Sequence, residues 1–198
     1  MTRLARARKI ISQYTTQPIV KLIARTPVTP DTLTWLGFLL TVASAVLVVN
    51  GNLFIAGLVV LFAGFFDMLD GALARITNRV TRFGGVLDST LDRLSEAVVM
   101  LGILVVYARE QQVWASLLVG VTLVGSFMVS YLRARVEALG IECREGVFTR
   151  PERVIILSVG LLLSRFDYAL VIALSIIALF SFLTVGQRLV YAWRRTRD

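Results

Sequence analysis

The chain has 198 residues, of which 57% are hydrophobic and only 17% are charged, and its mean hydropathy is +0.77. A soluble domain carries about 25% charged residues, and a chain this short cannot bury so much apolar surface in its own core. Lipid must cover the excess, which excludes a soluble enzyme, a disordered chain and a disulfide scaffold. The net charge is +8. Because the basic residues lie between hydrophobic segments, they favour anionic lipid headgroups or phosphate substrates as partners and not nucleic acid.

The N-terminal segment, residues 1–28, carries six basic residues among isolated apolar ones. It has no long apolar core and no small-residue cleavage site, so it does not have the pattern of a signal peptide. The pattern predicts a juxtamembrane amphipathic helix that lies on the membrane surface. The stretch Thr29-Pro30-Asp31-Thr32 then indicates the start of another helix.

Six hydrophobic segments follow, each near the length of about 20 residues that a bilayer requires. We place them at residues 32–50, 53–75, 83–108, 113–139, 152–165 and 168–192. The predicted fold is therefore an all-α integral membrane protein, with one six-helix membrane domain over residues 29–198. With the N-terminus inside, only Arg109 and Arg165 of the 21 basic residues fall outside. The positive-inside rule thus predicts a multi-pass cell-membrane protein with both termini in the cytoplasm.

Four aspartates interrupt the hydrophobic pattern of the second and third segments. Asp67 and Asp70 are three residues apart near the end of one helix, and Asp88 and Asp92 are four apart near the start of the next. These spacings place each pair on one helical face, and the short turn between the helices lets the two faces meet. A charged side chain at the centre of a bilayer costs about 2.5–3.5 kcal/mol. Four carboxylates in one cavity therefore require cations.

Divalent metal ions compensate such a cluster best. Arg75 and Arg93 neutralise part of the charge, but four oxygen ligands in a chain without histidine suit Mg²⁺, with Mn²⁺ as a substitute. Gly71 and Gly84 let a polyphosphate approach the backbone, and Arg75 and Thr81 are placed to touch a phosphate. A divalent-cation transporter is an alternative in another class, although it does not account for the spacing of the glycines and the arginine.

The spacing of these residues resembles the signature of CDP-alcohol phosphotransferases. The motif is Asp67-x2-Asp70-Gly71-x2-Ala74-Arg75-x8-Gly84-x3-Asp88-x3-Asp92, and it departs from the family pattern at no position. The six-helix architecture of the family agrees with the segment count, so the resemblance covers nearly the whole chain. It implies a homodimeric enzyme that transfers a phosphoalcohol from a CDP-linked donor to a hydroxyl acceptor and releases CMP.

The resemblance also implies a role for each motif residue. Asp67, Asp70, Asp88 and Asp92 are expected to hold two Mg²⁺ ions, and Asp92 is also expected to take the proton of the acceptor. The residues expected to contact the CDP-lipid are Asp31, Thr34, Gly71, Arg75, Thr81 and Gly84. Direct in-line attack needs no protein nucleophile, which suits a chain without histidine.

A second basic site is predicted for the acceptor. Its expected members are Ser130, Arg133, Arg153 and Arg188, because guanidinium groups match the geometry of a phosphate. The stretches Ser-Tyr-x-x-Ala-Arg and Arg-Pro-Glu-Arg resemble those of phosphatidylinositol-phosphate synthases and their archaeal archaetidyl counterparts. This resemblance implies CDP-diacylglycerol as donor and inositol phosphate as acceptor. The position of Arg133 is often lysine there, and a phosphate pocket alone does not recognise the polyol, so glycerol 3-phosphate is an alternative acceptor.

Overall fold

The computed structural model describes residues 18–143 and 145–196. The long helices are α2 (Pro30–Val49), α3 (Leu53–Ile76), α4 (Arg82–Arg109), α5 (Val113–Glu137), α6 (Arg150–Leu162) and α7 (Ala169–Arg195). Each of the six predicted segments is thus a helix, and its ends lie within three residues of the predicted ends. Most of the predicted N-terminal surface helix lies outside the described residues, and its described part is helical over residues 18–23.

Four of the described helices are long and apolar enough to cross a membrane, namely α2, α3, α5 and α7. The other two predicted spans differ from them for physical reasons. Helix α4 is long, but it carries Asp88, Asp92, Arg93 and Glu96 between its second turn and its midpoint. Helix α6 has 13 residues, which extend about 20 Å, whereas the hydrocarbon core of a bilayer is about 30 Å thick. The protein is therefore an all-helical, multi-pass membrane protein whose two shorter or more polar helices lie among four apolar ones.

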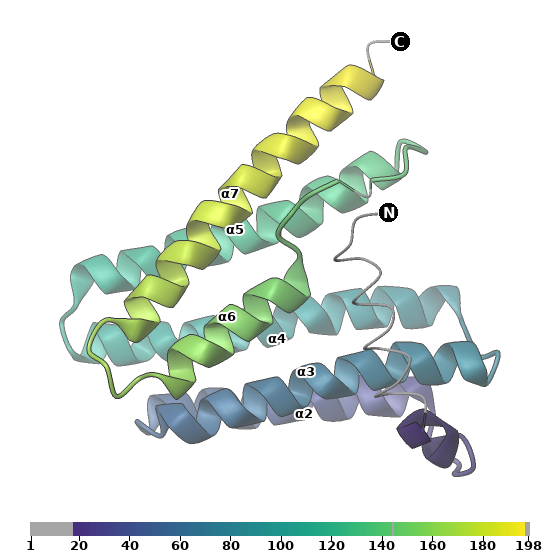
Figure 1. Cartoon of the computed structure of the whole chain (residues 1–198), viewed down its shortest axis with the longest axis horizontal. Coiled ribbons are helices and arrows are strands. Elements are labelled where there is room, and N and C mark those ends of the chain that lie inside the picture. The colour runs from purple at the N-terminus through teal and green to yellow at the C-terminus, as the bar shows by residue number, and fades with distance from the viewer. Residues whose placement is uncertain (1–17, 144, 197–198) are drawn as a thin grey trace.

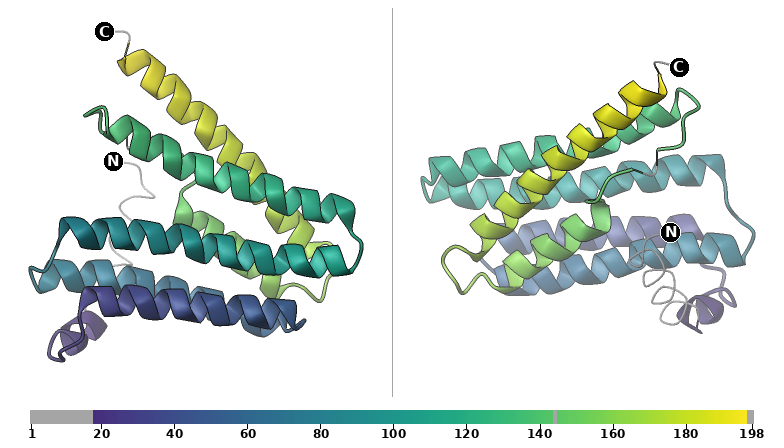
Figure 2. Two further views of the ribbon diagram at one scale, coloured as in Figure 1. Left: turned by 180° about the vertical axis from the view of Figure 1, so that it is seen from behind. Right: turned by 45° about the horizontal axis from the view of Figure 1, so that its top comes forward.

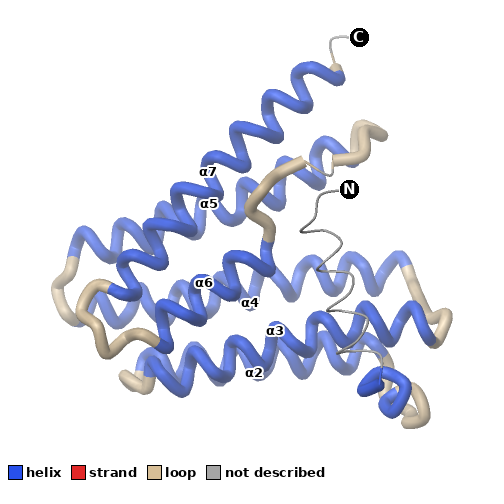
Figure 3. Tube along the Cα trace, viewed as in Figure 1, coloured by secondary structure: helices blue, strands red, loops and turns tan. Residues whose placement is uncertain are grey.

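The helices form one bundle in which short α6 holds two groups together (Figure 1). Helix α2 packs against both α3 and α4, and α5 packs along α7. Helix α6 contacts α3 on one side and α7 on the other, and α4 contacts α5. The turn between α3 and α4, the connection from α5 to α6 and the C-terminal end of α7 lie at the same end of the bundle (Figures 2 and 3). The site residues of α3, α4, α5 and α6 are therefore brought toward this end.

Glycines let the helices that carry the site approach closely. A Cβ atom at Gly57 of α3 would lie 3.0 Å from the Cβ atom of Leu161 of α6. A Cβ atom at Gly102 of α4 would lie 3.1 Å from the carbonyl oxygen of Ala45 of α2. Small residues at such contacts are typical of membrane helices, because close packing takes the place of the hydrophobic effect in lipid.

Two apolar clusters hold the bundle on either side of the carboxylates. The larger one joins all six long helices and includes Val60 of α3 and Met100 of α4. The smaller one comprises Val20, Leu33, Leu69 and Leu73. Val20 has no exposed surface, so the described end of the N-terminal segment is docked on α2 and α3. Along α3, Asp67 lies between Val60 of the first cluster and Leu69 of the second.

Candidate active site

The turn from α3 to α4 gathers three of the residues predicted to contact the CDP-lipid. Thr81 is the N-cap of α4, and its hydroxyl oxygen accepts a hydrogen bond from the backbone N–H of Gly84 at 2.9 Å. A Cβ atom at Gly84 would lie 3.4 Å from a carboxylate oxygen of Asp31, at the start of α2. Arg75, a fourth predicted residue, is exposed and reaches back over Gly71. Asp31, Thr81 and Gly84 therefore form one patch, beside the N-terminus of α4.

Asp70 is fixed by two of the other predicted CDP-lipid residues. Its side chain is buried, and the hydroxyl of Thr34 donates to its Oδ2 at 2.7 Å. The backbone N–H of Gly71 donates to its Oδ1. Thr34 and Gly71 thus orient a motif carboxylate, a role that the sequence analysis did not predict for them.

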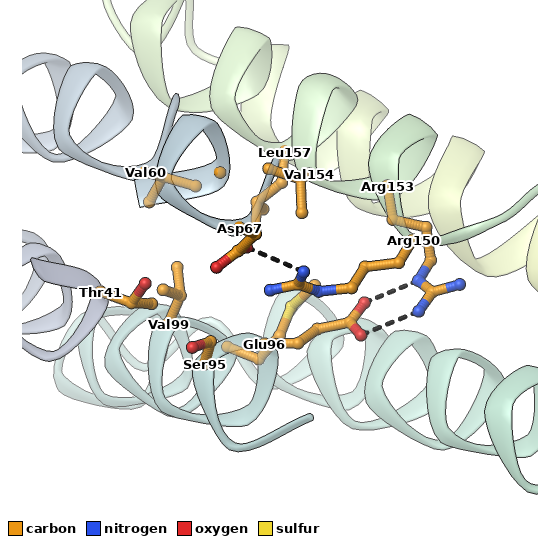
Figure 4. A pocket seen from close by; sticks show the side chains of 12 residues that line it. Thr41, Val60, Asp67, Ser95, Glu96, Val99, Arg150, Arg153, Val154 and Leu157 are labelled. Atoms are coloured by element: carbon orange, nitrogen blue, oxygen red, sulfur yellow. Dashed lines mark hydrogen bonds and ion pairs between the residues drawn. The ribbon is translucent and has the colours of Figure 1, made fainter. Parts of the chain in front are cut away.

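Arg150 bridges the carboxylates of two helices. One of its terminal nitrogens lies 2.8 Å from Oδ2 of Asp67 on α3 and 2.7 Å from Oδ1 of Asp92 on α4. Figure 4 shows the side chain of Arg150 extending from α6 to Asp67, next to a small cavity of about 30 Å³. A cation from α6 therefore sits between carboxylates that the sequence analysis paired only with metal ions, Arg75 and Arg93.

The start of α6 is built to hold two arginines in place. Thr149 is the N-cap, and Glu152 accepts hydrogen bonds from its backbone N–H at 2.8 Å and from its hydroxyl at 2.6 Å. This capping box, with Pro151 in the first turn, fixes the direction in which the helix begins. Arg150 and Arg153 are three residues apart, so they project from the same side of α6 toward α3 and α4.

Arg153 forms a buried ion pair with Glu96 of α4. The Nε and Nη2 atoms of Arg153 donate to the two carboxylate oxygens of Glu96 at 2.7 and 2.9 Å, as Figure 4 shows. The hydroxyl of Ser126 on α5 donates to the same carboxylate at 2.7 Å. Glu96 is not among the site residues predicted from the sequence. The signal was present, because Asp88, Asp92 and Glu96 continue at a spacing of four along one face of α4.

A second cavity of about 130 Å³ contains all four residues predicted to bind the phosphate of the acceptor. The residues that line it are Asp92, Arg93, Glu96, Val129, Ser130, Arg133, Thr149, Arg150, Arg153 and Arg188. The structure therefore brings together residues from α4, α5, α6 and α7 that are far apart in the sequence. Asp92, the predicted general base, lies on the wall of the same cavity.

We call this second cavity the acceptor cavity. Its arginines are fixed by neighbouring groups to different degrees. Arg188 is buried and donates from Nε to the carbonyl oxygen of Glu145 at 2.9 Å and from Nη1 to that of Val129. Arg133 is paired with Glu137 at 2.9 Å, but both side chains are largely exposed. Arg133 is therefore the most adaptable of the cavity arginines, whereas Arg188 is a fixed positive charge.

The donor set fits a divalent metal ion. The four motif aspartates offer only carboxylate oxygens, which Mg²⁺ and Mn²⁺ prefer. The guanidinium of Arg150 lies between Asp67 and Asp92 and forms ion pairs with both of them. In the described part of the chain no three acidic side chains converge closely enough to hold a metal ion as they stand. Because Arg150 lies between Asp67 and Asp92, a metal ion held by both of these carboxylates would take the place of its guanidinium.

Comparison with known proteins shows to which family the chain belongs. Residues 27–192 match the sequence profile of CDP-alcohol phosphatidyltransferases. The chain belongs to this family. The archaetidylinositol phosphate synthase of Methanothermobacter thermautotrophicus is 39% identical over 170 residues, which cover 84% of this chain and 84% of that protein. The phosphatidylinositol phosphate synthase of Mycobacterium tuberculosis is 40% identical over 187 residues, which cover 90% of this chain and 85% of the relative.

Crystal structures of this mycobacterial synthase have the same fold. The structure with bound CDP-DAG matches with a TM-score of 0.82 and 39% identity, over 90% of this chain and 94% of that chain. The structure in complex with manganese and citrate matches with a TM-score of 0.80 and 40% identity, over 90% and 88% of the two chains. The family that the aspartate motif resembles is thereby confirmed, and both kinds of synthase singled out from the acceptor-site stretches are among the relatives.

The bridge made by Arg150 predicts the effect of its removal on stability. Arg150→Gln should lower the melting temperature in EDTA, because it removes the cation shared by two partly buried carboxylates. This loss costs less than removal of one partner from a fully buried pair, which costs about 3–5 kcal/mol. Mg²⁺ should restore more stability in this variant than in the wild type, since the ion no longer competes with a guanidinium. Thermal unfolding in detergent, with EDTA and with increasing Mg²⁺, measures both effects.

Arg109→Gln is the matched control for this measurement. Arg109 is an exposed arginine at the opposite end of the bundle and donates to the carbonyl oxygen of Val49. This control should change neither the melting temperature in EDTA nor the response to Mg²⁺. Equal melting temperatures of Arg150→Gln and the wild type in EDTA would show that the bridge does not stabilise the metal-free protein.

Proposed function

We propose that this protein transfers the phosphatidyl group of CDP-diacylglycerol to a hydroxyl group of inositol phosphate and releases CMP. The observation that carries the proposal is the acceptor cavity, where one wall carries Asp92 and the others carry Arg133, Arg153 and Arg188. A carboxylate and several guanidinium groups around one cavity suit an acceptor with both a hydroxyl group to be deprotonated and a phosphate to be held. The names of the synthases from Mycobacterium tuberculosis and Methanothermobacter thermautotrophicus support the same acceptor.

Asp92 acts as the general base in this proposal. Its carboxylate takes the proton of the acceptor hydroxyl as the oxygen attacks the phosphorus of the lipid phosphate. The bond between that phosphorus and the bridging oxygen of CMP breaks, and CMP leaves with the electron pair. Ser130, Arg133, Arg153 and Arg188 hold the phosphate of the acceptor, so that its hydroxyl is presented to Asp92.

The motif carboxylates hold two Mg²⁺ ions, for which Mn²⁺ can substitute. Asp67, Asp70, Asp88 and Asp92 are the ligands, and Thr34 supports this arrangement by fixing the orientation of Asp70. When bound, the ions neutralise the pyrophosphate of the donor and activate the departing CMP. Manganese in the related mycobacterial structure supports a divalent ion in this family.

The CDP moiety lies over the turn from α3 to α4. The patch of Asp31, Thr81 and Gly84 offers polar groups there, and the exposed guanidinium of Arg75 is available for a phosphate. Gly71 leaves this side of α3 open, because a Cβ atom there would meet nothing closer than the Arg75 side chain at 3.6 Å. The CDP-DAG in the mycobacterial structure supports such a donor.

All six long helices are inserted in the cell membrane, and the protein acts as a homodimer. Helices α4 and α6 can lie in the membrane because the other four helices surround their polar side chains. The end of the bundle with the active site faces the cytoplasm, as do both termini of the chain, since most of the basic residues that the structure describes lie at this end. Water-soluble CMP and inositol phosphate then leave and enter on the cytoplasmic side.

A panel of acceptors tests the reaction. Purified protein with CDP-diacylglycerol and Mg²⁺ should release CMP fastest with inositol phosphate, and inositol should be a poor acceptor because the acceptor cavity would be left with unpaired arginines. Release of CMP and mass spectrometry of the lipid product measure the outcome. An equal or higher kcat/KM with glycerol 3-phosphate would contradict the assigned acceptor, and no release of CMP with any acceptor would contradict the reaction class.

Cysteine labelling tests the orientation. Single cysteines at Asn52 and Gln111 should react with an impermeant maleimide from outside intact cells, and a cysteine at Leu139 should react only after the cytoplasmic side is opened. All three positions are exposed, whereas the native Cys143 is buried and contributes little background. Labelling of the Leu139 variant from outside would reverse the proposed orientation.

A further inference from the structure

We infer that Glu96 is a positioning residue for the acceptor phosphate, because it holds two nitrogens of Arg153 and leaves the third free for the ligand. The inference rests on the proposed function and extends it to a residue outside the aspartate motif. Arg153 is 2% exposed, and its Nη1 atom has no hydrogen-bond partner among the described residues. Since Arg153 lines the acceptor cavity, this buried donor is available to a phosphate oxygen.

The bidentate contact with Glu96 fixes the plane of the Arg153 guanidinium. The contacts of Nε at 2.7 Å and Nη2 at 2.9 Å leave the group no rotation without breaking a charge-assisted bond. The hydroxyl of Ser126 fixes the carboxylate in turn, at 2.7 Å. The chain of Ser126, Glu96 and Arg153 thus runs from α5 through α4 to α6 and ends at the cavity.

Stability alone does not account for this buried pair. The Glu96 side chain is almost entirely buried, and desolvation of two charges offsets much of their attraction, so apolar residues in such a place are often equally stable. A preorganised donor is useful, by contrast, wherever a phosphate must be held in one orientation. The buried charges are thus better explained by ligand positioning than by folding.

The position of Arg150 shows which contact Glu96 prevents Arg153 from making. It lies one turn earlier on the same side of α6, and its guanidinium pairs with Asp67 and Asp92. Without Glu96, the guanidinium of Arg153 would be free to turn toward the same carboxylates and away from the acceptor. Glu96 therefore keeps Arg153 on the acceptor side of the site.

Glu96→Gln is the first test, because it removes the charge and one acceptor oxygen at constant size. The KM for inositol phosphate should rise about tenfold or more, as expected for loss of a charge-assisted contact, while the KM for CDP-diacylglycerol stays within about twofold. Glu110→Gln is the control, since Glu110 is the exposed C-cap of α4, at the end of the helix far from the aspartates, and it should change neither constant. Glu96→Asp, which keeps the charge on a shorter side chain, should recover part of the loss.

A double variant separates positioning from a general structural role. If Glu96 acts through Arg153, then Glu96→Gln should add nothing to the KM for inositol phosphate in an Arg153→Ala background. Additive effects, or an equal rise of the KM values for both substrates, would overturn the inference. Lack of turnover by the wild type with every phosphorylated acceptor would instead contradict the proposed function.

Ser126→Ala keeps the inference testable if Glu96→Gln does not fold. This variant removes one hydrogen bond and leaves the ion pair, so the KM for inositol phosphate should rise by a smaller factor of about two to five, with an unchanged KM for CDP-diacylglycerol. Unfolding of both variants, or an unchanged KM for inositol phosphate in Ser126→Ala, would assign the cluster to stability and overturn the inference.

Discussion

Negative charge enclosed between apolar helices is the constraint on which this structure depends. Asp67, Asp92 and Glu96 extend from α3 and α4 toward α6 in a bundle whose outside is largely hydrophobic, and each needs a positive or hydrogen-bonding partner. Helix α6 supplies the decisive ones, because Arg150 reaches Asp67 and Asp92 and Arg153 reaches Glu96. The short α6 therefore positions these two arginine side chains. Its capping box and its close contact with α3 fix the helix in place for that role.

The two arginines of α6 also connect the parts of the site. Arg150 lies between carboxylates that are proposed to hold metal ions, and it lines the acceptor cavity as well. Arg153, one turn later, lines the same cavity. The two proposed binding sites thus share one helix, so a displacement of α6 would affect the metal and acceptor sites together. Asp92, the proposed base, both pairs with Arg150 and lines the acceptor cavity.

The sequence was sufficient for features that depend on periodicity and spacing. Hydrophobic segment lengths predicted six helices and their ends, and the spacing of the aspartates placed Asp67 and Asp92 on helix faces that meet at Arg150. The grouping of Ser130, Arg133, Arg153 and Arg188 was also predicted, with support from the resemblance to known synthases. Each of these follows from which face of a helix a residue occupies.

Partners across helices could not be predicted in the same way. Helical spacing does not reveal that Thr34 of α2 turns to Asp70, or that Arg153 pairs with Glu96, because arginine has many rotamers and several carboxylates lie within reach. The spacing of four from Asp92 to Glu96 marked the correct face, but the acidic partner of Arg153 emerged only from the packing of α6. The proposed insertion of α4 and α6 in the membrane likewise depends on their neighbours, because their own composition does not mark them as spans.

The central claim, that Asp92 is the base at a cavity shared with the acceptor, is tested most directly by the Asp92→Asn variant. Turnover with CDP-diacylglycerol and inositol phosphate should fall by a factor of about 10² or more, as expected for loss of a general base. Binding of CDP-diacylglycerol, measured on the same preparation in the presence of Mg²⁺, should be largely retained, because Asp67, Asp70 and Asp88 remain. A kcat close to that of the wild type at saturating acceptor would contradict the account.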